Sequence, residues 1–184
     1  MTALPKHKMT VDEYLAWAEA QEGRYELDDG QAVAMSPEQG QHLRVKGAVF
    51  LALVAAIKRG GLPCEAFPDG ATVRIDTHTA FEPDALVNCG QRMGDAEVVA
   101  PSPVIVVEVL SPSTGYRDNA HKLANYFRVP SIQHYLIVDP NVRRIVHHKR
   151  GLGDVLETRI CAEGTIKLDP PGLEIAAEEV FAGL

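Results

Sequence analysis

The chain has 184 residues, of which 46% are hydrophobic and 23% charged, so it is long and apolar enough for one domain with a hydrophobic core. The formal net charge of −7 argues against a protein whose whole surface binds nucleic acid, although it leaves room for a local basic cleft or a metal-neutralised carboxylate cluster. No apolar run reaches the length of a membrane span, and the N-terminus lacks the apolar core of a signal peptide. We therefore expect no membrane association and a cytoplasmic location.

The first helix is predicted to begin at Thr10. Thr10 and Glu13 have the spacing of a capping box, in which each side chain satisfies a backbone N–H of the other residue. Two strand-like runs follow at residues 24–27 and 31–35, joined by an Asp-Asp-Gly turn. A turn of this kind between β-type runs predicts a hairpin.

A second helix is predicted with Ser36 as its cap and with Gly60 and Gly61 at its end. Residues 48–57 are apolar on nearly all sides, which indicates burial on more than one side of this helix.

The three cysteines, Cys64, Cys89 and Cys161, are widely spaced and include no C-x-x-C pair. The sequence therefore supports neither a zinc knuckle nor a disulfide framework.

The rest of the chain alternates strand and helix patterns. The expected elements are strands at 71–76 and 85–88, a loop at 91–100, a central strand from Val104, a helix from Arg117 or Asp118, strands at 132–138 and 142–149, and a short helix near 177–181. This order predicts an α+β fold with α/β character, in which helices flank a mixed β-sheet, and a single domain over residues 1–184.

Glu108 follows a run of four β-branched residues at 104–107, which is typical of a strand covered on both faces. Pro112 is expected to end that strand. An ionised carboxylate in a dry interior costs several kcal/mol unless a cation or hydrogen-bond donors meet it. Glu108 therefore marks the end of a central strand, where open α/β sheets carry their ligands.

Asp84 is the second acid near a strand end, directly after Pro83. If its strand pairs with the strand of Glu108, the two carboxylates can face one cation. Oxygen ligands select hard ions such as magnesium or manganese, which polarise a phosphoryl oxygen and lower the pKa of a bound water. The alternative interpretation is that Asp84 caps a turn and that a structural arginine neutralises Glu108.

Seven stretches resemble, in their order along the chain, a bacterial family of restriction-endonuclease-like proteins within the PD-(D/E)XK nuclease superfamily. They are T-V-D-E-Y-L at 10–15, R-Y-E-L-D-D-G at 24–30, A-M-S-P at 34–37, P-D-A-L-V at 83–87, V-V-E-V-L-S-P-S-T at 106–114, R-D-N-A-H-K-L-A-N-Y at 117–126 and Y-L-I-V-D-P at 135–140. The resemblance implies a restriction-endonuclease-like domain over residues 1–184. It also implies metal-dependent hydrolysis of nucleic acid, with DNA as the expected substrate, and a homodimer.

The resemblance implies Asp84 and Glu108 as ligands of Mg²⁺ or Mn²⁺, with the backbone carbonyl of Val109 as a third. The superfamily usually has a lysine two residues after the glutamate, and this position is Leu110 here. In the similar family the lysine comes from the following helix, which matches Lys122. Its implied role is to orient or activate the attacking water and to offset the charge of the phosphate.

A solvated surface position is the alternative for Lys122. The apolar stripe of its helix consists of Ala120, Leu123, Ala124 and Phe127, and Lys122 lies away from the centre of that stripe.

Glu26 is the fourth catalytic candidate, and in the similar family it resembles an extra acidic ligand or a residue that positions the site, with an outward-facing strand glutamate as the alternative. Three further residues are accessory candidates. His42 can touch phosphate or the edge of the site, although a helix-surface histidine is the more common case. Glu82 can support the neighbouring aspartate, but it points to the other face if the strand alternates. Tyr126 shares a helix face with the candidate lysine.

Six basic or imidazole residues between 143 and 150 form the one basic cluster. Such a cluster can contact phosphates, but an edge strand guarded against pairing explains it as well, and we favour the edge strand.

Three functions are compatible with these patterns. The leading hypothesis is a magnesium-dependent endonuclease. The second is a catalytically inactive nuclease-fold module that binds nucleic acid or a protein partner. The third is a hydrolase or interaction module whose substrate is not nucleic acid. Metal binding distinguishes the first from the others.

Overall fold

The computed structural model of the chain describes residues 7–111, 116–182 and 184. A six-stranded sheet forms its centre, and among the described strands β7 and β8 are the one parallel pair, so the sheet is mixed as predicted. Across the sheet the order is β10 (Leu156–Cys161), β9 (Arg144–Arg150), β8 (His134–Asp139), β7 (Pro103–Val109), β6 (Ala85–Cys89) and β3 (Cys64–Pro68). Pro112, the residue expected to end the central strand, lies outside the described residues.

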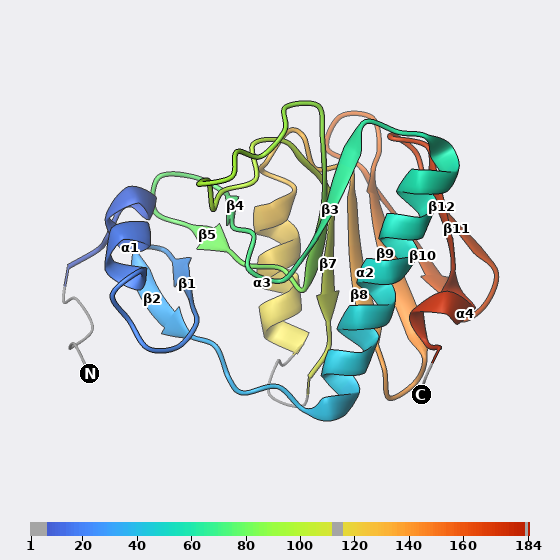
Figure 1. The fold of residues 1–184 in the computed structure, drawn as a ribbon, viewed down its shortest axis with the longest axis horizontal. Helices are drawn as coiled ribbons and strands as arrows, with labels where there is room; N and C mark the ends of the chain where they lie inside the picture. The colour runs from blue at the N-terminus through green and yellow to red at the C-terminus, as the bar shows by residue number, and fades with distance from the viewer. Residues whose placement is uncertain (1–6, 112–115, 183) are drawn as a thin grey trace.

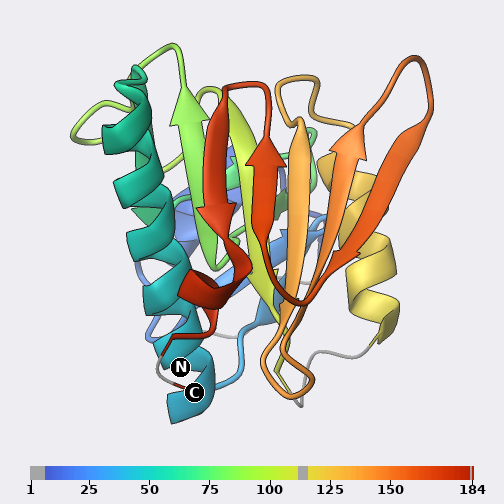
Figure 2. The same ribbon diagram turned by 90° about the vertical axis from the view of Figure 1, so that its right-hand side faces the viewer.

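Two layers cover the opposite faces of this sheet (Figures 1 and 2). α2 (Gly40–Gly60), the hairpin of β11 (Thr165–Leu168) and β12 (Leu173–Ala176), and α4 (Ala177–Val180) cover one face, and α3 (Tyr116–Tyr126) covers the other. Because side chains alternate along a strand, Ile105 and Val107 pack into the α2 layer and Val106 packs with Tyr126 of α3. Glu108 has the parity of Val106 and therefore faces α3.

A smaller sheet carries α1 (Val11–Ala18) beside the central sheet (Figure 1). Its strand order is β2 (Gln31–Ala34), β1 (Tyr25–Asp28), β5 (Ala80–Phe81) and β4 (Val73–Arg74). The capping box of Thr10 and the predicted hairpin are both confirmed. The strand predicted at 71–76 is present but shorter, because β4 spans only Val73–Arg74 and residues 76–79 turn the chain back into β5. β5 then leads directly through Glu82 and Pro83 to Asp84, which joins the two sheets at the candidate site.

The predicted start of α2 is wrong. Gln39, and not Ser36, is its N-cap, with φ −82° and ψ 153°. The predicted end is confirmed, since Gly61 has the left-handed φ of 57° that glycine adopts easily. Burial on more than one side is also wrong, because the sheet covers one stripe and leaves Leu43 and Leu51 more than half exposed.

α2 is, by length and composition alone, the one helix of the described residues that could cross a membrane. Its buried stripe packs on β3, β6 and β12, as the core helix of a globular domain does.

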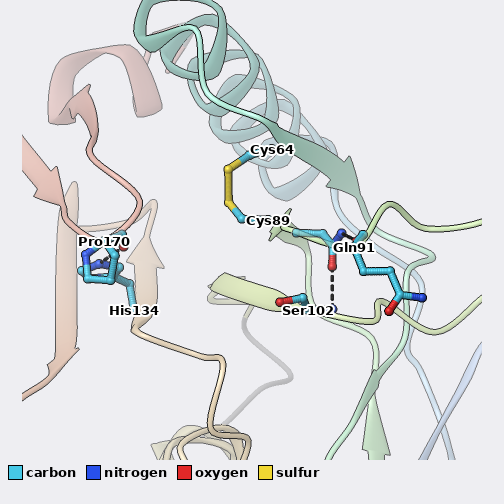
Figure 3. Close-up of a disulfide and its surroundings, with 7 residues drawn as sticks. Cys64, Cys89, Gln91, Ser102, His134 and Pro170 are labelled. Atoms are coloured by element: carbon cyan, nitrogen blue, oxygen red, sulfur yellow. Dashed lines mark hydrogen bonds between the residues drawn. A yellow bond between two sulfur atoms is a disulfide. The ribbon is translucent and has the colours of Figure 1, made fainter.

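Cys64 and Cys89 form a disulfide, so the prediction of no disulfide is wrong (Figure 3). β3 and β6 are antiparallel neighbours, and their register places the two cysteines opposite each other with 4.3 Å between their Cα atoms. The pair could not be predicted because residues 64–68 carry no clear strand pattern in the sequence. Cys161 is a free thiol.

The edge-strand interpretation of residues 143–150 is wrong as well. β9 pairs with β8 on one side and with β10 on the other, so β10 is the edge. The basic residues of β9 therefore divide between the two faces of an interior strand.

Candidate metal and phosphodiester site

A cleft of about 280 Å³ opens between the small sheet, the N-terminal end of α2, the ends of β6 and β7, and α3. Six of the eight predicted site residues line it: Glu26, His42, Asp84, Glu108, Val109 and Lys122. Glu82 and Tyr126 lie behind this wall and hydrogen-bond to residues in it.

Asp84 and Glu108 lie at the same end of two paired strands. Ala85 of β6 pairs with Val107 of β7, and the two acids are the next residues beyond this pair. The Oδ2 of Asp84 accepts the backbone N–H of Val109 at 2.7 Å, which ties the two strand ends together. The side-by-side pairing that a shared cation requires is therefore present.

A lysine and a tyrosine donate hydrogen bonds to Glu108, so the alternative interpretation, in which a structural arginine neutralises it, is wrong. Its Oε1 accepts hydrogen bonds from the Nζ of Lys122 at 3.0 Å and from the hydroxyl of Tyr126 at 2.7 Å. Burial raises the pKa of Glu108 to about 7, and the negative charges of Asp84 and Glu26 add to this rise while Lys122 opposes it. A further cation near the carboxylate would favour its ionised form.

Lys122 is only 6% exposed, so it is not a solvated surface lysine. Its Nζ also lies 3.0 Å from the Oε1 of Glu26. Burial lowers the pKa of Lys122, but the carboxylates of Glu108 and Glu26 outweigh this effect and raise it. Lys122 is therefore a fixed cation inside the cleft.

The apolar stripe predicted for α3 is confirmed only in part, because Leu123 and Phe127 pack against the core whereas Ala120 and Ala124 are exposed. The buried described residues of this helix are instead Asn119, Lys122, Asn125 and Tyr126. The helix packs against the acidic cleft as well as against the sheet. Polar side chains on its buried face, such as Lys122 and Tyr126, therefore find carboxylate partners there.

Glu26 faces the cleft, so the outward-facing alternative is wrong. Its Oε1 accepts the backbone N–H of Glu82 at 2.9 Å in addition to its contact with Lys122. The side chain of Glu82 points to Arg24, whose Nε donates to it at 3.1 Å. Glu82 thus holds Glu26 through its backbone and contributes no carboxylate to the cleft.

His42 is 6% exposed, which excludes the surface-histidine alternative. Its Nε2 donates to the carbonyl of Val109 at 2.8 Å and lies 3.5 Å from the Oδ2 of Asp84. Burial lowers the pKa of His42, but contacts with Asp84 and the Val109 carbonyl outweigh this effect and raise it.

Lys46 is a second buried lysine, and it was not among the predicted site residues. Its Nζ lies 2.6 Å from Glu38, 2.7 Å from Asp69 and 3.0 Å from Asp84. Burial raises the pKa of Asp84, but its contacts with His42, Lys46 and the backbone N–H of Val109 outweigh this effect and lower it. One signal was present in the sequence: His42 and Lys46 interrupt the apolar stripe of α2 one turn apart.

The residues present fit a divalent cation. The carboxylates of Glu26, Glu38, Asp69, Glu82, Asp84 and Glu108 form one connected network with the cations Arg24, Lys46 and Lys122. The acids exceed these three cations, and carboxylate and carbonyl oxygens are the ligands that magnesium and manganese prefer.

Comparison with known proteins gives a consistent family assignment. A family model, Uma2, described as "Putative restriction endonuclease", matches residues 11–181. The uncharacterized protein slr1290 of Synechocystis sp. is 32% identical over 182 residues, which cover 98% of this chain and 95% of that protein. The uncharacterized protein sll1609 of the same organism is 24% identical over 149 residues, which cover 79% of this chain and 82% of that protein.

A solved structure shares the fold. It is described as "a putative nuclease belonging to DUF820" from Anabaena variabilis, and it superposes with a TM-score of 0.74 at 16% identity over 95% of this chain and 98% of that chain. The predicted fold, a mixed sheet flanked by helices in a restriction-endonuclease-like arrangement, is thereby confirmed.

Proposed function

The chain belongs to the Uma2 family of restriction-endonuclease-like proteins, and from this premise we propose that it is a metal-dependent endonuclease that hydrolyses phosphodiester bonds of DNA. The observation that carries the proposal is the meeting of Asp84, Glu108 and a buried Lys122 in one cleft. These groups come from three different elements. A purely structural acid pair would not need a cleft open to a substrate.

The proposed roles follow from the contacts. Asp84, Glu108 and the Val109 carbonyl would hold Mg²⁺ or Mn²⁺, which when bound supplies Lewis-acid polarisation of the phosphate and a water of lowered pKa. Lys122 would orient that water and offset negative charge on the phosphate. Glu26 would hold Lys122 in place, and Tyr126 would fix the orientation of Glu108.

Cleavage of supercoiled plasmid and of single-stranded DNA tests the proposal. We expect cleavage with Mg²⁺ or Mn²⁺, none with a chelator, and at least a hundred-fold loss in Asp84→Asn, Glu108→Gln and Lys122→Met, which remove charge with little change in shape. Lys167→Met is the matched control, since Lys167 is an exposed lysine on β11 away from the cleft.

Each outcome has a distinct meaning. Loss of cleavage in the two acid variants alone would remove Lys122 from the proposed mechanism. DNA affinity that falls with salt, without cleavage by the wild type, would favour the inactive nuclease-fold module. No cleavage and no binding of DNA or Mn²⁺ would overturn the proposal. Light scattering of the intact chain tests the predicted homodimer, and the cytoplasmic location stays a prediction.

A further inference from the structure

His42 presents an unsatisfied nitrogen to the cleft. Its Nε2–H donates to the Val109 carbonyl, so the neutral ring has its lone pair on Nδ1. Nδ1 is buried and has no hydrogen-bond partner among the described residues. The Oε2 of Glu38 is likewise buried and has no hydrogen-bond partner in the part of the chain that the structure describes, and it lies 3.5 Å from Nδ1. Two buried lone pairs that face each other are costly unless a positive group lies between them.

Lys46 does not fill this gap. It binds the other oxygen of each neighbouring carboxylate, Oε1 of Glu38 and Oδ1 of Asp84. Oε2 of Glu38 and Oδ2 of Asp84 are left on the side of His42, where Oδ2 also accepts the Val109 N–H. One donor atom from each of the three side chains lies within 4.8 Å of the others.

We propose that His42 Nδ1 and Glu38 Oε2, with Asp84 as a shared third ligand, bind a zinc-class divalent ion beside the proposed magnesium site. Two ligands held about 2.0–2.1 Å from an ion at the tetrahedral angle are about 3.4 Å apart. The separation of Nδ1 from Oε2 is 3.5 Å. The three side chains leave room in the coordination sphere for a water or a phosphate oxygen from the cleft.

A proton on Nδ1 is the competing occupant, and the geometry disfavours it. A charge-assisted N–H···O bond is about 2.7–2.9 Å long, which is much shorter than the observed separation. A histidine that ligates a metal, by contrast, usually donates its other ring N–H to a carbonyl or carboxylate, as His42 does to Val109.

The nitrogen donor sets the metal preference. Imidazole suits Zn²⁺ and other late first-row ions such as Co²⁺, whereas Mg²⁺ and Mn²⁺ prefer a shell of oxygens. The two sites should therefore differ in metal selectivity although they share Asp84. This inference adds to the proposed function, but its test does not depend on cleavage.

Calorimetric titration with Zn²⁺, Co²⁺ and Mg²⁺, together with the visible absorption of bound Co²⁺, tests the site. The full chain would carry Cys161→Ser, so that no free thiol competes. We expect His42→Gln and Glu38→Gln each to weaken Zn²⁺ and Co²⁺ binding at least ten-fold with little change for Mg²⁺. Glu108→Gln should do the reverse.

His121→Gln is the matched control, because His121 is an exposed histidine that pairs with Asp28 outside the cluster. Circular dichroism establishes that each variant is folded, and Zn²⁺ should raise the melting temperature of the parent but not of His42→Gln. Unchanged Zn²⁺ and Co²⁺ affinity in a folded His42→Gln would overturn the inference, whether or not the protein cleaves DNA.

Discussion

At the scale of single residues, two side chains offset the free-energy cost of burying the carboxylate of Glu108. It receives one ammonium, from Lys122, and one hydroxyl, from Tyr126, on the same oxygen. Both donors come from α3, one turn apart, so a single helix supplies them together. Tyr126 is fully buried and has its hydroxyl on Glu108, so its ring packs in the core while its polar end supports the site.

Tyr126→Phe should lower the free energy of unfolding by about 2 kcal/mol, because it removes a buried hydrogen bond to a charged group. Urea unfolding measures this loss. Metal-dependent cleavage should fall about ten-fold, less than in Glu108→Gln, because the carboxylate remains but is less well oriented.

The double variant Tyr126→Phe/Glu108→Gln separates this contact from general damage to packing. If the hydroxyl acts through Glu108, the double variant should lose clearly less stability than the two single losses combined. Additive losses would show that Tyr126 acts elsewhere.

At the scale of elements, Arg150 anchors the connection between α3 and β8. It is the last residue of β9, and its guanidinium donates to the carbonyls of Ile132, Phe127 and Val129 at 2.8, 2.9 and 2.9 Å. It also lies over the ring of Phe127, 5.2 Å from the centroid. A residue predicted to be solvated on an edge strand instead satisfies three loop carbonyls.

Arg150→Lys should destabilise the protein by about 2 kcal/mol, because an ammonium cannot match the planar fork that reaches three carbonyls at once. Chemical denaturation measures the change. Arg144→Lys, at an exposed position at the other end of β9, should stay within about 0.5 kcal/mol of the wild type. Equal effects in the two variants would contradict the anchoring role.

At the scale of the whole molecule, a buried histidine pair couples stability to pH. His134 Nδ1 and His147 Nε2 share a hydrogen bond of 2.9 Å, and His134 Nε2 donates to the carbonyl of Pro170, beside which it lies (Figure 3). This pair connects β8, β9 and the loop between β11 and β12. Burial lowers the pKa of each histidine to about 4, and nearby positive charge, from Lys149 and Arg159 among others, adds to the effect.

The unfolded chain, with ordinary histidine pKa values of about 6.5, binds protons between pH 6.5 and 4 that the folded chain does not bind. The stability from the neutral pair is therefore fully present above pH 6.5 and is lost as the pH falls toward 4. Each histidine should contribute a loss on the order of 2 kcal/mol between pH 7 and 5. The raised pKa of Glu108 acts in the opposite direction over the same range, so the difference in urea unfolding between the wild type and His147→Gln measures the contribution of His147.

His147→Gln should flatten this pH dependence, whereas His121→Gln, which changes an exposed histidine, should leave it as steep as in the wild type. A folded His147→Gln protein with an unchanged slope would show that other groups cause the pH dependence.

Features that depend on neighbours along the chain could be predicted from the sequence alone. The capping box at Thr10, the hairpin and the end of α2 at Gly61 follow from local backbone preferences. The run of β-branched residues before Glu108 was enough to predict a central strand, and the position of Asp84 after Pro83 marked it as a second acid near a strand end. The resemblance to a known family pointed to Lys122.

Contacts between groups that are distant in the sequence depend on how the elements pack in the folded chain. Lys46 connects Glu38 to Asp84 because α2 packs on the strands that follow it, and Cys64 meets Cys89 only through the register of β3 and β6. The polar face of α3 is buried because its partner is an acidic cleft. Periodicity in a sequence shows which side chains share a face, but it does not show what that face will pack against. The free-energy cost of burying a polar face depends on the charges and hydrogen-bond partners that it meets in the folded chain.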